Sequence, residues 1–156
     1  MSSFTPVLLF VAFRVAASGS SALGILASMN IQFVVIDPDG LRTGRDPATG
    51  IDLSEIPWSE YGVKATGETE SANGDRSRYL VVGTGSGGQL KDGAYIFRVY
   101  GEKPGPFWLS ISVYREPVSE DFNIKGTIRS GGAREYRLHF AGDLSVPIKI
   151  DTLGSK

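Results

Sequence analysis

The stretch from Lys91 to Arg115 constrains the fold more than any other part of the sequence. Large apolar side chains occur at every second position in Tyr95 to Val99, and again in Leu109 to Val113. A two-residue period is that of a β-strand, in which successive side chains point to opposite faces. Gly101 to Pro106 separates the two runs, and its prolines cannot donate to a strand ladder. The stretch therefore predicts two adjacent strands joined by a tight polar loop.

The second face of these two strands carries more polar side chains, such as Arg98 and Ser110. Strands with one apolar face and one face of mixed polar and apolar residues are typical of an antiparallel sheet that is covered on one side. We expect Phe97 and Ile111 on the inward faces of the two adjacent strands. Two strands alone are marginally stable in water, so the pair requires a larger sheet and a second layer.

The rest of the sequence repeats this pattern of short apolar runs between turns. Its 156 residues suit one domain with a core, and its 20 glycines and 8 prolines favour many turns over long helices. We predict an all-β fold, an antiparallel β-sandwich of about eight short strands with jelly-roll or immunoglobulin-like topology. Residues 51–61 are expected to be irregular or 3₁₀, with Trp58 and Tyr61 packed on a sheet. Further strands are expected at residues 31–36, 78–82, 121–129, 133–141 and 146–150.

The first 28 residues differ from the others because Arg14 is their only charged side chain. Pro6 to Phe13 is an apolar run followed by small residues, as in a secretory signal peptide, although no basic residue precedes the run. The run is too short to span a membrane. The alternative is an ordinary buried strand at Val7 to Phe13. We therefore expect residues 1–28 to be a signal-like or extra N-terminal segment, and residues 29–151 to be the β-sandwich module.

Charge and residue usage argue against several functional classes. A net charge of −1 provides no strong field for nucleic acid or an anionic membrane, and the absence of cysteine removes disulfides and thiolate chemistry. His139 is the only histidine, so a zinc site would lack ligands. Gly83 to Gly88 matches G-x-G-x-x-G, but a turn and a strand follow it where a dinucleotide site needs a helix. We predict no enzymatic activity, and paired carboxylates such as Asp52 and Glu55 are interpreted as solvated surface residues.

Asp37, Asp39 and Asp46 are the candidate metal ligands, and Ca²⁺ is the candidate ion. The D-x-D-G start resembles the opening of a calcium loop. The fifth and twelfth positions of such a loop would, however, be Leu41 and Ala48, which offer no side-chain oxygen. The favoured interpretation is a turn held by aspartate side chains that bond to the local backbone, with no cofactor.

Four aromatic residues are the candidate ligand-binding residues: Trp58, Tyr100, Trp108 and Tyr114. Trp108 and Tyr114 are expected on the strand face opposite Leu109. A flat aromatic row on a sheet can stack against sugar rings. The alternative is that a second sheet or the N-terminal segment buries this face, since aromatic residues are more often buried than ligand-binding.

Several short motifs occur in order along the chain: Asp37-Pro38-Asp39-Gly40, Gly44 to Gly50 (GRDPATG), Ile56-Pro57, Tyr61, and Gly93 to Tyr114. Together they resemble bacterial secreted β-sandwich modules over about residues 30–141. The part from Gly93 is also similar to the pre-peptidase C-terminal domain family. The resemblance implies a non-catalytic accessory or binding module, secreted or at the cell surface, without catalytic residues. A polysaccharide or another cell-surface component is the expected partner; the alternatives are a structural spacer and, remotely, a hydrolase.

Overall fold

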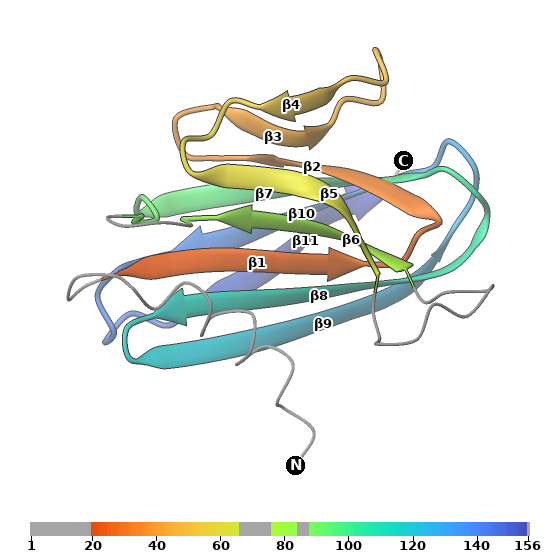
Figure 1. Ribbon diagram of the computed structural model, residues 1–156. Coiled ribbons are helices and arrows are strands. Elements are labelled where there is room, and N and C mark those ends of the chain that lie inside the picture. The colour runs from red at the N-terminus through yellow and green to blue at the C-terminus, as the bar shows by residue number, and fades with distance from the viewer. Residues whose placement is uncertain (1–19, 66–75, 84–87, 156) are drawn as a thin grey trace.

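The computed structural model describes residues 20–65, 76–83 and 88–155, and within them the chain is all-β. Two antiparallel sheets stack face to face, which confirms the predicted sandwich (Figure 1). The described residues form eleven strands in place of about eight, because short strands also form in regions that the sequence favoured as turns or irregular structure. The strands are β1 (Ser21–Ala27), β2 (Ile31–Ile36), β3 (Arg42–Arg45), β4 (Asp52–Ser54), β5 (Ser59–Ala65), β6 (Arg76–Val82), β7 (Gly93–Gly101), β8 (Gly105–Arg115), β9 (Val118–Ile128), β10 (Ala133–Phe140) and β11 (Lys149–Ser155).

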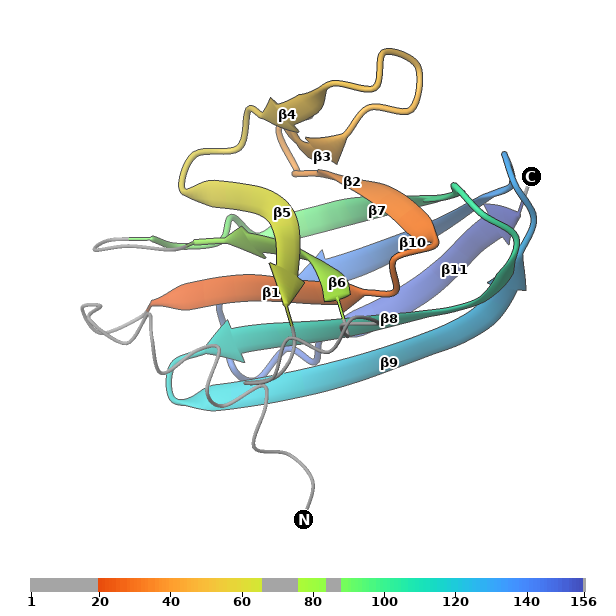
Figure 2. The ribbon, with the colours of Figure 1, turned by 45° about the vertical axis from the view of Figure 1, so that its right-hand side comes forward.

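The five-stranded sheet has the order β5-β6-β1-β8-β9, and the six-stranded sheet has the order β11-β10-β7-β2-β3-β4. Their facing sides hold the apolar rows, and the fully buried residues include Leu23, Phe33, Phe97, Ile111 and Leu138. The curvature of the strands is clearest in the second view (Figure 2). Each sheet therefore keeps one face for the core and leaves the other face outside.

The predicted hairpin between residues 91 and 115 is wrong. β7 belongs to the six-stranded sheet and β8 to the five-stranded sheet, so the polar link crosses between the two layers. Phe97 and Ile111 do face inward, both with no exposed surface, but from opposite sheets. The link forms backbone hydrogen bonds with other segments of the chain. The Gly101 amide donates to the Gly132 carbonyl, and the Glu102 amide donates to the Asn30 carbonyl. Alternation thus predicts which face a strand buries, but not which strand lies beside it.

The expected start of the sandwich at residue 29 also differs from the structure. β1, inside the segment set apart in the sequence, pairs with both β6 and β8 near the middle of its sheet. Residues 22, 23 and 25 are almost completely buried. The sequence pattern did not predict this strand, because Ser21, Ala22 and Gly24 are too small to show the alternation of large apolar residues that is typical of a strand. The signal-like run and the alternative strand at residues 7–13 lie outside the described residues.

Residues 51–61 contain parts of two strands where an irregular segment was expected, and residues 55–58 between them are irregular. β4 and the beginning of β5 both lie in this range. Tyr61 packs against the core as predicted, with its ring edge-on to Phe33 at a centroid distance of 5.3 Å. Trp58 does not pack down, because it is 60% exposed and adopts a positive φ of 59°. Its carbonyl accepts the Gly83 amide, which holds this backbone turn against the end of β6.

Two arginines point inward and close the ends of the core. At one end, Arg78 on β6 donates to Glu102 at 2.7 Å, and Glu102 also accepts from Gln32 at 2.9 Å. Tyr61 donates to Gln32 at 2.5 Å, so the network joins residues of both sheets. Arg115 on β8 lies at the other end, with only 5% of its surface exposed. Buried charges of this kind require partners. The Nη atoms of both guanidinium groups have them, whereas the buried Nε of each has none among the described residues.

The described part of the chain contains no helix that is long and apolar enough to cross a membrane.

Candidate functional site

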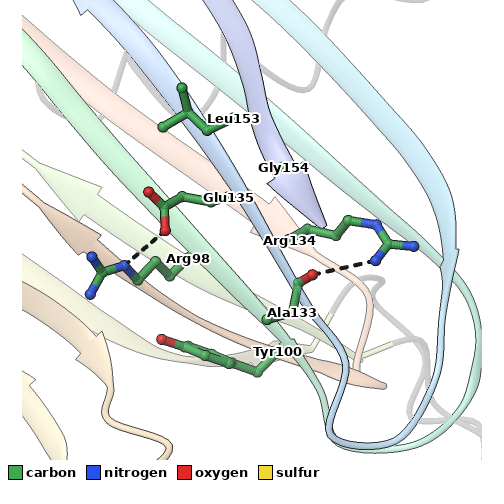
Figure 3. A pocket seen from close by; sticks show the side chains of 7 residues that line it. All are labelled: Arg98, Tyr100, Ala133, Arg134, Glu135, Leu153 and Gly154. Atoms are coloured by element: carbon green, nitrogen blue, oxygen red, sulfur yellow. Dashed lines mark hydrogen bonds and ion pairs between the residues drawn. The ribbon is translucent and has the colours of Figure 1, made fainter. Parts of the chain in front are cut away.

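A hollow with an aromatic wall lies on the outer face of the six-stranded sheet. Its volume is about 590 Å³, and its walls come from β7, β10 and β11 (Figure 3). Arg98 and Tyr100 project from β7 next to each other, because residues two positions apart share one face of a strand. The lining residues are Arg98, Tyr100, Ala133, Arg134, Glu135, Leu153 and Gly154. We call this hollow the Tyr100 groove.

An irregularity in β11 shapes one wall of the groove. Glu135 on β10 is opposite Gly154, whereas the next residue, Tyr136, is opposite Thr152. Leu153 is therefore an extra residue, as in a β-bulge, and it is 38% exposed at the rim. Gly154 has a φ of 155°, within the range that favours glycine, and a Cβ there would meet no atom within 4 Å. The bulge thus leaves open space beside Glu135.

The polar side of the groove is an ion pair. Arg98 and Glu135 are direct partners across the β7–β10 ladder, and Arg98 Nε donates to Glu135 Oε2 at 3.1 Å. Both side chains are more than one third exposed, so the pair orients polar groups and contributes little to stability. Arg134 extends away from the pair and donates to the Thr127 carbonyl at 2.9 Å.

Tyr100 supplies the aromatic surface of the groove. Burial raises the pKa of its phenol, an effect that Arg98 opposes and that Asp46 and Glu135 reinforce. The phenol is therefore neutral at ordinary pH and available as a donor or acceptor. An aromatic face beside a planar guanidinium and a carboxylate can contact both the apolar face and the hydroxyl groups of a sugar ring.

The groove is poorly equipped for glycoside hydrolysis. That reaction ordinarily uses two carboxyl groups, one on each side of the scissile bond. Among the described lining residues, Glu135 is the single carboxylate, and it is paired with Arg98. The arrangement suits binding better than bond cleavage.

The four predicted aromatic residues do not form one site. Tyr100 lies in the groove, whereas Trp108 and Tyr114 lie on the outer face of β8, in the other sheet. Trp108 is 39% exposed and Tyr114 is half-buried, and Trp58 lies in the connection from β4 to β5. The expected aromatic row is therefore divided between two opposite faces and one loop.

Sequence reasoning missed Arg98, Glu135 and Leu153 as members of the site. The alternation of β7 already places Arg98 and Tyr100 on one face, and that signal could have found this half. Glu135 could not be assigned to the site without knowing the register between β7 and β10. The position of Leu153 at the rim of the groove depends on the bulge in β11. Register and bulges arise from pairing between distant segments.

The aspartates at 37, 39 and 46 are separately engaged. Asp37 Oδ1 accepts the backbone amides of Asp39 at 2.9 Å and Leu41 at 2.8 Å, and Asp46 Oδ1 accepts the amide of Ala48 at 2.9 Å. Asp39 forms an ion pair with Lys91. The predicted bonds to the local backbone are confirmed. In the part of the chain that the structure describes, no three acidic or histidine side chains are grouped as metal ligands. The calcium alternative stays a prediction for solution work.

Other titratable residues considered from the sequence form surface ion pairs. His139 Nε2 lies 2.9 Å from Asp151, Asp52 pairs with Arg45, and Glu55 pairs with Arg42. The Arg42 guanidinium lowers the pKa of Glu55 by hydrogen bonding. These pairs are exposed, and none of their residues lines the groove.

No known protein family, characterised protein or solved structure matches this chain. The functional argument therefore depends on the chemistry of the groove.

Proposed function

We propose that this protein is a non-catalytic binding module and that the Tyr100 groove binds a saccharide. The observation that carries the proposal is the combination, in one hollow, of the Tyr100 ring, the Arg98–Glu135 pair and the Leu153 rim. Sugar rings have an apolar face of C–H groups and an edge of hydroxyl groups. The tyrosine and leucine match the first, and the charged pair matches the second.

The dimensions and rigidity of the groove agree with this use. A volume of about 590 Å³ falls in the range of small-ligand sites. The walls are strands rather than loops, so the side chains are held before a ligand arrives and less entropy is lost on binding. The open form of the hollow on a sheet face suits a residue within a chain as well as a single sugar. The Arg98–Glu135 pair has no net charge, and the Arg134 guanidinium extends away from it towards the Thr127 carbonyl, so the pair itself suits a neutral saccharide.

The test is a glycan array followed by calorimetry with the best neutral oligosaccharide. Tyr100→Ala should abolish binding, and Glu135→Gln should weaken it because one charged acceptor becomes a neutral amide. Both residues lie on an outer face, so the variants should remain folded, which melting curves would verify. Trp108→Ala is the matched control, since it removes a partly exposed aromatic residue from the opposite sheet.

Three results would contradict the proposal. The first is a wild-type protein that binds no glycan on the array. The second is undiminished binding by Tyr100→Ala. The third is loss of binding in Trp108→Ala alone, which would move the site to the five-stranded sheet.

A further inference from the structure

A second exposed surface lies at one end of the sandwich, away from the Tyr100 groove. Val118, Leu144 and Val146 are 41%, 48% and 43% exposed. Val118 begins β9 directly opposite Arg115, the last residue of β8. The connection from β10 to β11, which carries the other two residues, lies beside these strand ends (Figure 1). We call these three residues the aliphatic patch.

Arg115 fixes the backbone that displays the patch. Its Nη1 lies within hydrogen-bonding distance of the carbonyl oxygens of Ala141 at 2.9 Å, Asp143 at 2.8 Å and Val146 at 2.8 Å, so that its two N–H groups are shared among three acceptors. Its Nη2 donates to Glu120 at 2.9 Å. Charge-assisted bonds to three carbonyls hold this connection in one conformation. Leu144 and Val146 are thus displayed on an ordered support, which reduces the entropy lost when a partner binds.

A small acidic pocket of about 160 Å³ adjoins the patch, and its wall includes Asp92, Arg115 and Glu116. Asp92 accepts the Gly142 amide at 2.8 Å, and Glu116 accepts the Ser20 hydroxyl at 3.2 Å. These donors are neutral, and within the described residues neither carboxylate belongs to an ion pair. Arg115 is paired with Glu120, so the pocket keeps a net negative charge.

We propose that this end of the sandwich docks a basic, apolar polypeptide segment. A lysine or arginine of the partner enters the pocket and pairs with Asp92 and Glu116. Aliphatic residues next to it in the partner cover Val118, Leu144 and Val146. The pocket is too small for a drug-sized ligand but can take one cationic head group. Charge complementarity fixes the register, and burial of the patch supplies the apolar contact. This inference is independent of the saccharide proposal.

The probe is a short fluorescein-labelled peptide of alternating lysine and leucine, and the measurement is fluorescence anisotropy with the full chain. We expect saturable binding that weakens as salt is added. The double variant Leu144→Ser/Val146→Ser should weaken binding about tenfold or more, equivalent to roughly 1.4 kcal/mol. Glu116→Gln should also weaken it, while keeping an acceptor for the Ser20 hydroxyl. A peptide with glutamate in place of lysine should not bind.

The matched control is Ile51→Ser/Val63→Ser, which changes two aliphatic residues that are 59% and 47% exposed elsewhere. This variant should bind like the wild type, and melting curves should show all variants folded. Absence of binding to the basic peptide, equal binding of the acidic peptide, or equal loss in the control variant would overturn the proposal. Sedimentation is measured in parallel. Self-association that Leu144→Ser/Val146→Ser abolishes would assign the surface to a second copy and would equally overturn it.

Discussion

Replacement of Phe97 by alanine tests the packing of the two sheets most sharply. Phe97 lies on β7 with no exposed surface, inside the core that both sheets share. Burial of such a side chain contributes roughly 1.5–3 kcal/mol. The cavity left behind adds about 24 cal/mol for each Å³ that does not collapse. We therefore expect Phe97→Ala to lower the free energy of unfolding by about 3–5 kcal/mol.

The assay is urea denaturation followed by far-UV circular dichroism, with a thermal melt of the same samples. A loss of this size should lower the melting temperature by roughly 6–20 °C in a domain of this length. Trp108→Ala is the contrast, because Trp108 points outward and is 39% exposed. Its loss should cost about 1 kcal/mol, an ordinary value for a point substitution. Equal, large losses in both variants would refute the assignment of Trp108 to an outer face. A loss below about 1 kcal/mol for Phe97→Ala would refute its place in the shared core, since replacing a buried phenylalanine by alanine typically costs about 3–5 kcal/mol.

Three further predictions concern the turns and the ionisable core. Addition of EDTA should leave the melting temperature unchanged, because Asp37 and Asp46 are satisfied by backbone amides; a drop that Ca²⁺ restores would make them ligands. Burial raises the pKa of Tyr95 to about 12, so its contribution to stability is complete below pH 10 and is lost as pH rises towards 12. In alkaline denaturation, Tyr95→Phe should show a shallower decline than wild type over that interval, and identical curves would contradict this. Gly44→Ala should destabilise far more than Gly105→Ala in melting experiments; both have positive φ, but a Cβ at residue 44 would lie 2.3 Å from the Phe33 carbonyl oxygen, whereas one at 105 meets nothing within 4 Å. Equal effects would show that backbone strain outweighs the clash.

The class of fold and the buried faces could be predicted because they depend on local alternation. The rows from Tyr95 to Val99 and from Leu109 to Val113 face the core as their pattern indicates. The partner strands could not be predicted, because the link at Gly101 to Pro106 is compatible with a hairpin and with a crossing between layers. In the structure, backbone hydrogen bonds from Gly101 and Glu102 to distant residues hold the link where it crosses between the two sheets.

The candidate site was predictable in part for a similar reason. Tyr100 was identified as a ligand-binding candidate by its residue type, and it does line the groove. Trp108 was selected by the same criterion, yet it lies on the other sheet. Residue type shows what a side chain can bind, whereas the register between β7 and β10 determines that Glu135 stands beside Arg98. Such pairing over 37 positions leaves no local signal in one sequence.

The most direct test of the saccharide-binding groove is a nuclear magnetic resonance titration of the ¹⁵N-labelled protein with a neutral oligosaccharide selected on the array. We predict saturable shifts of the backbone amides of Arg98, Tyr100, Glu135 and Gly154, which lie on three neighbouring strands. The amide of Trp108 should not move. Shifts confined to the outer face of β8, or no shifts at saturating sugar, would contradict the account.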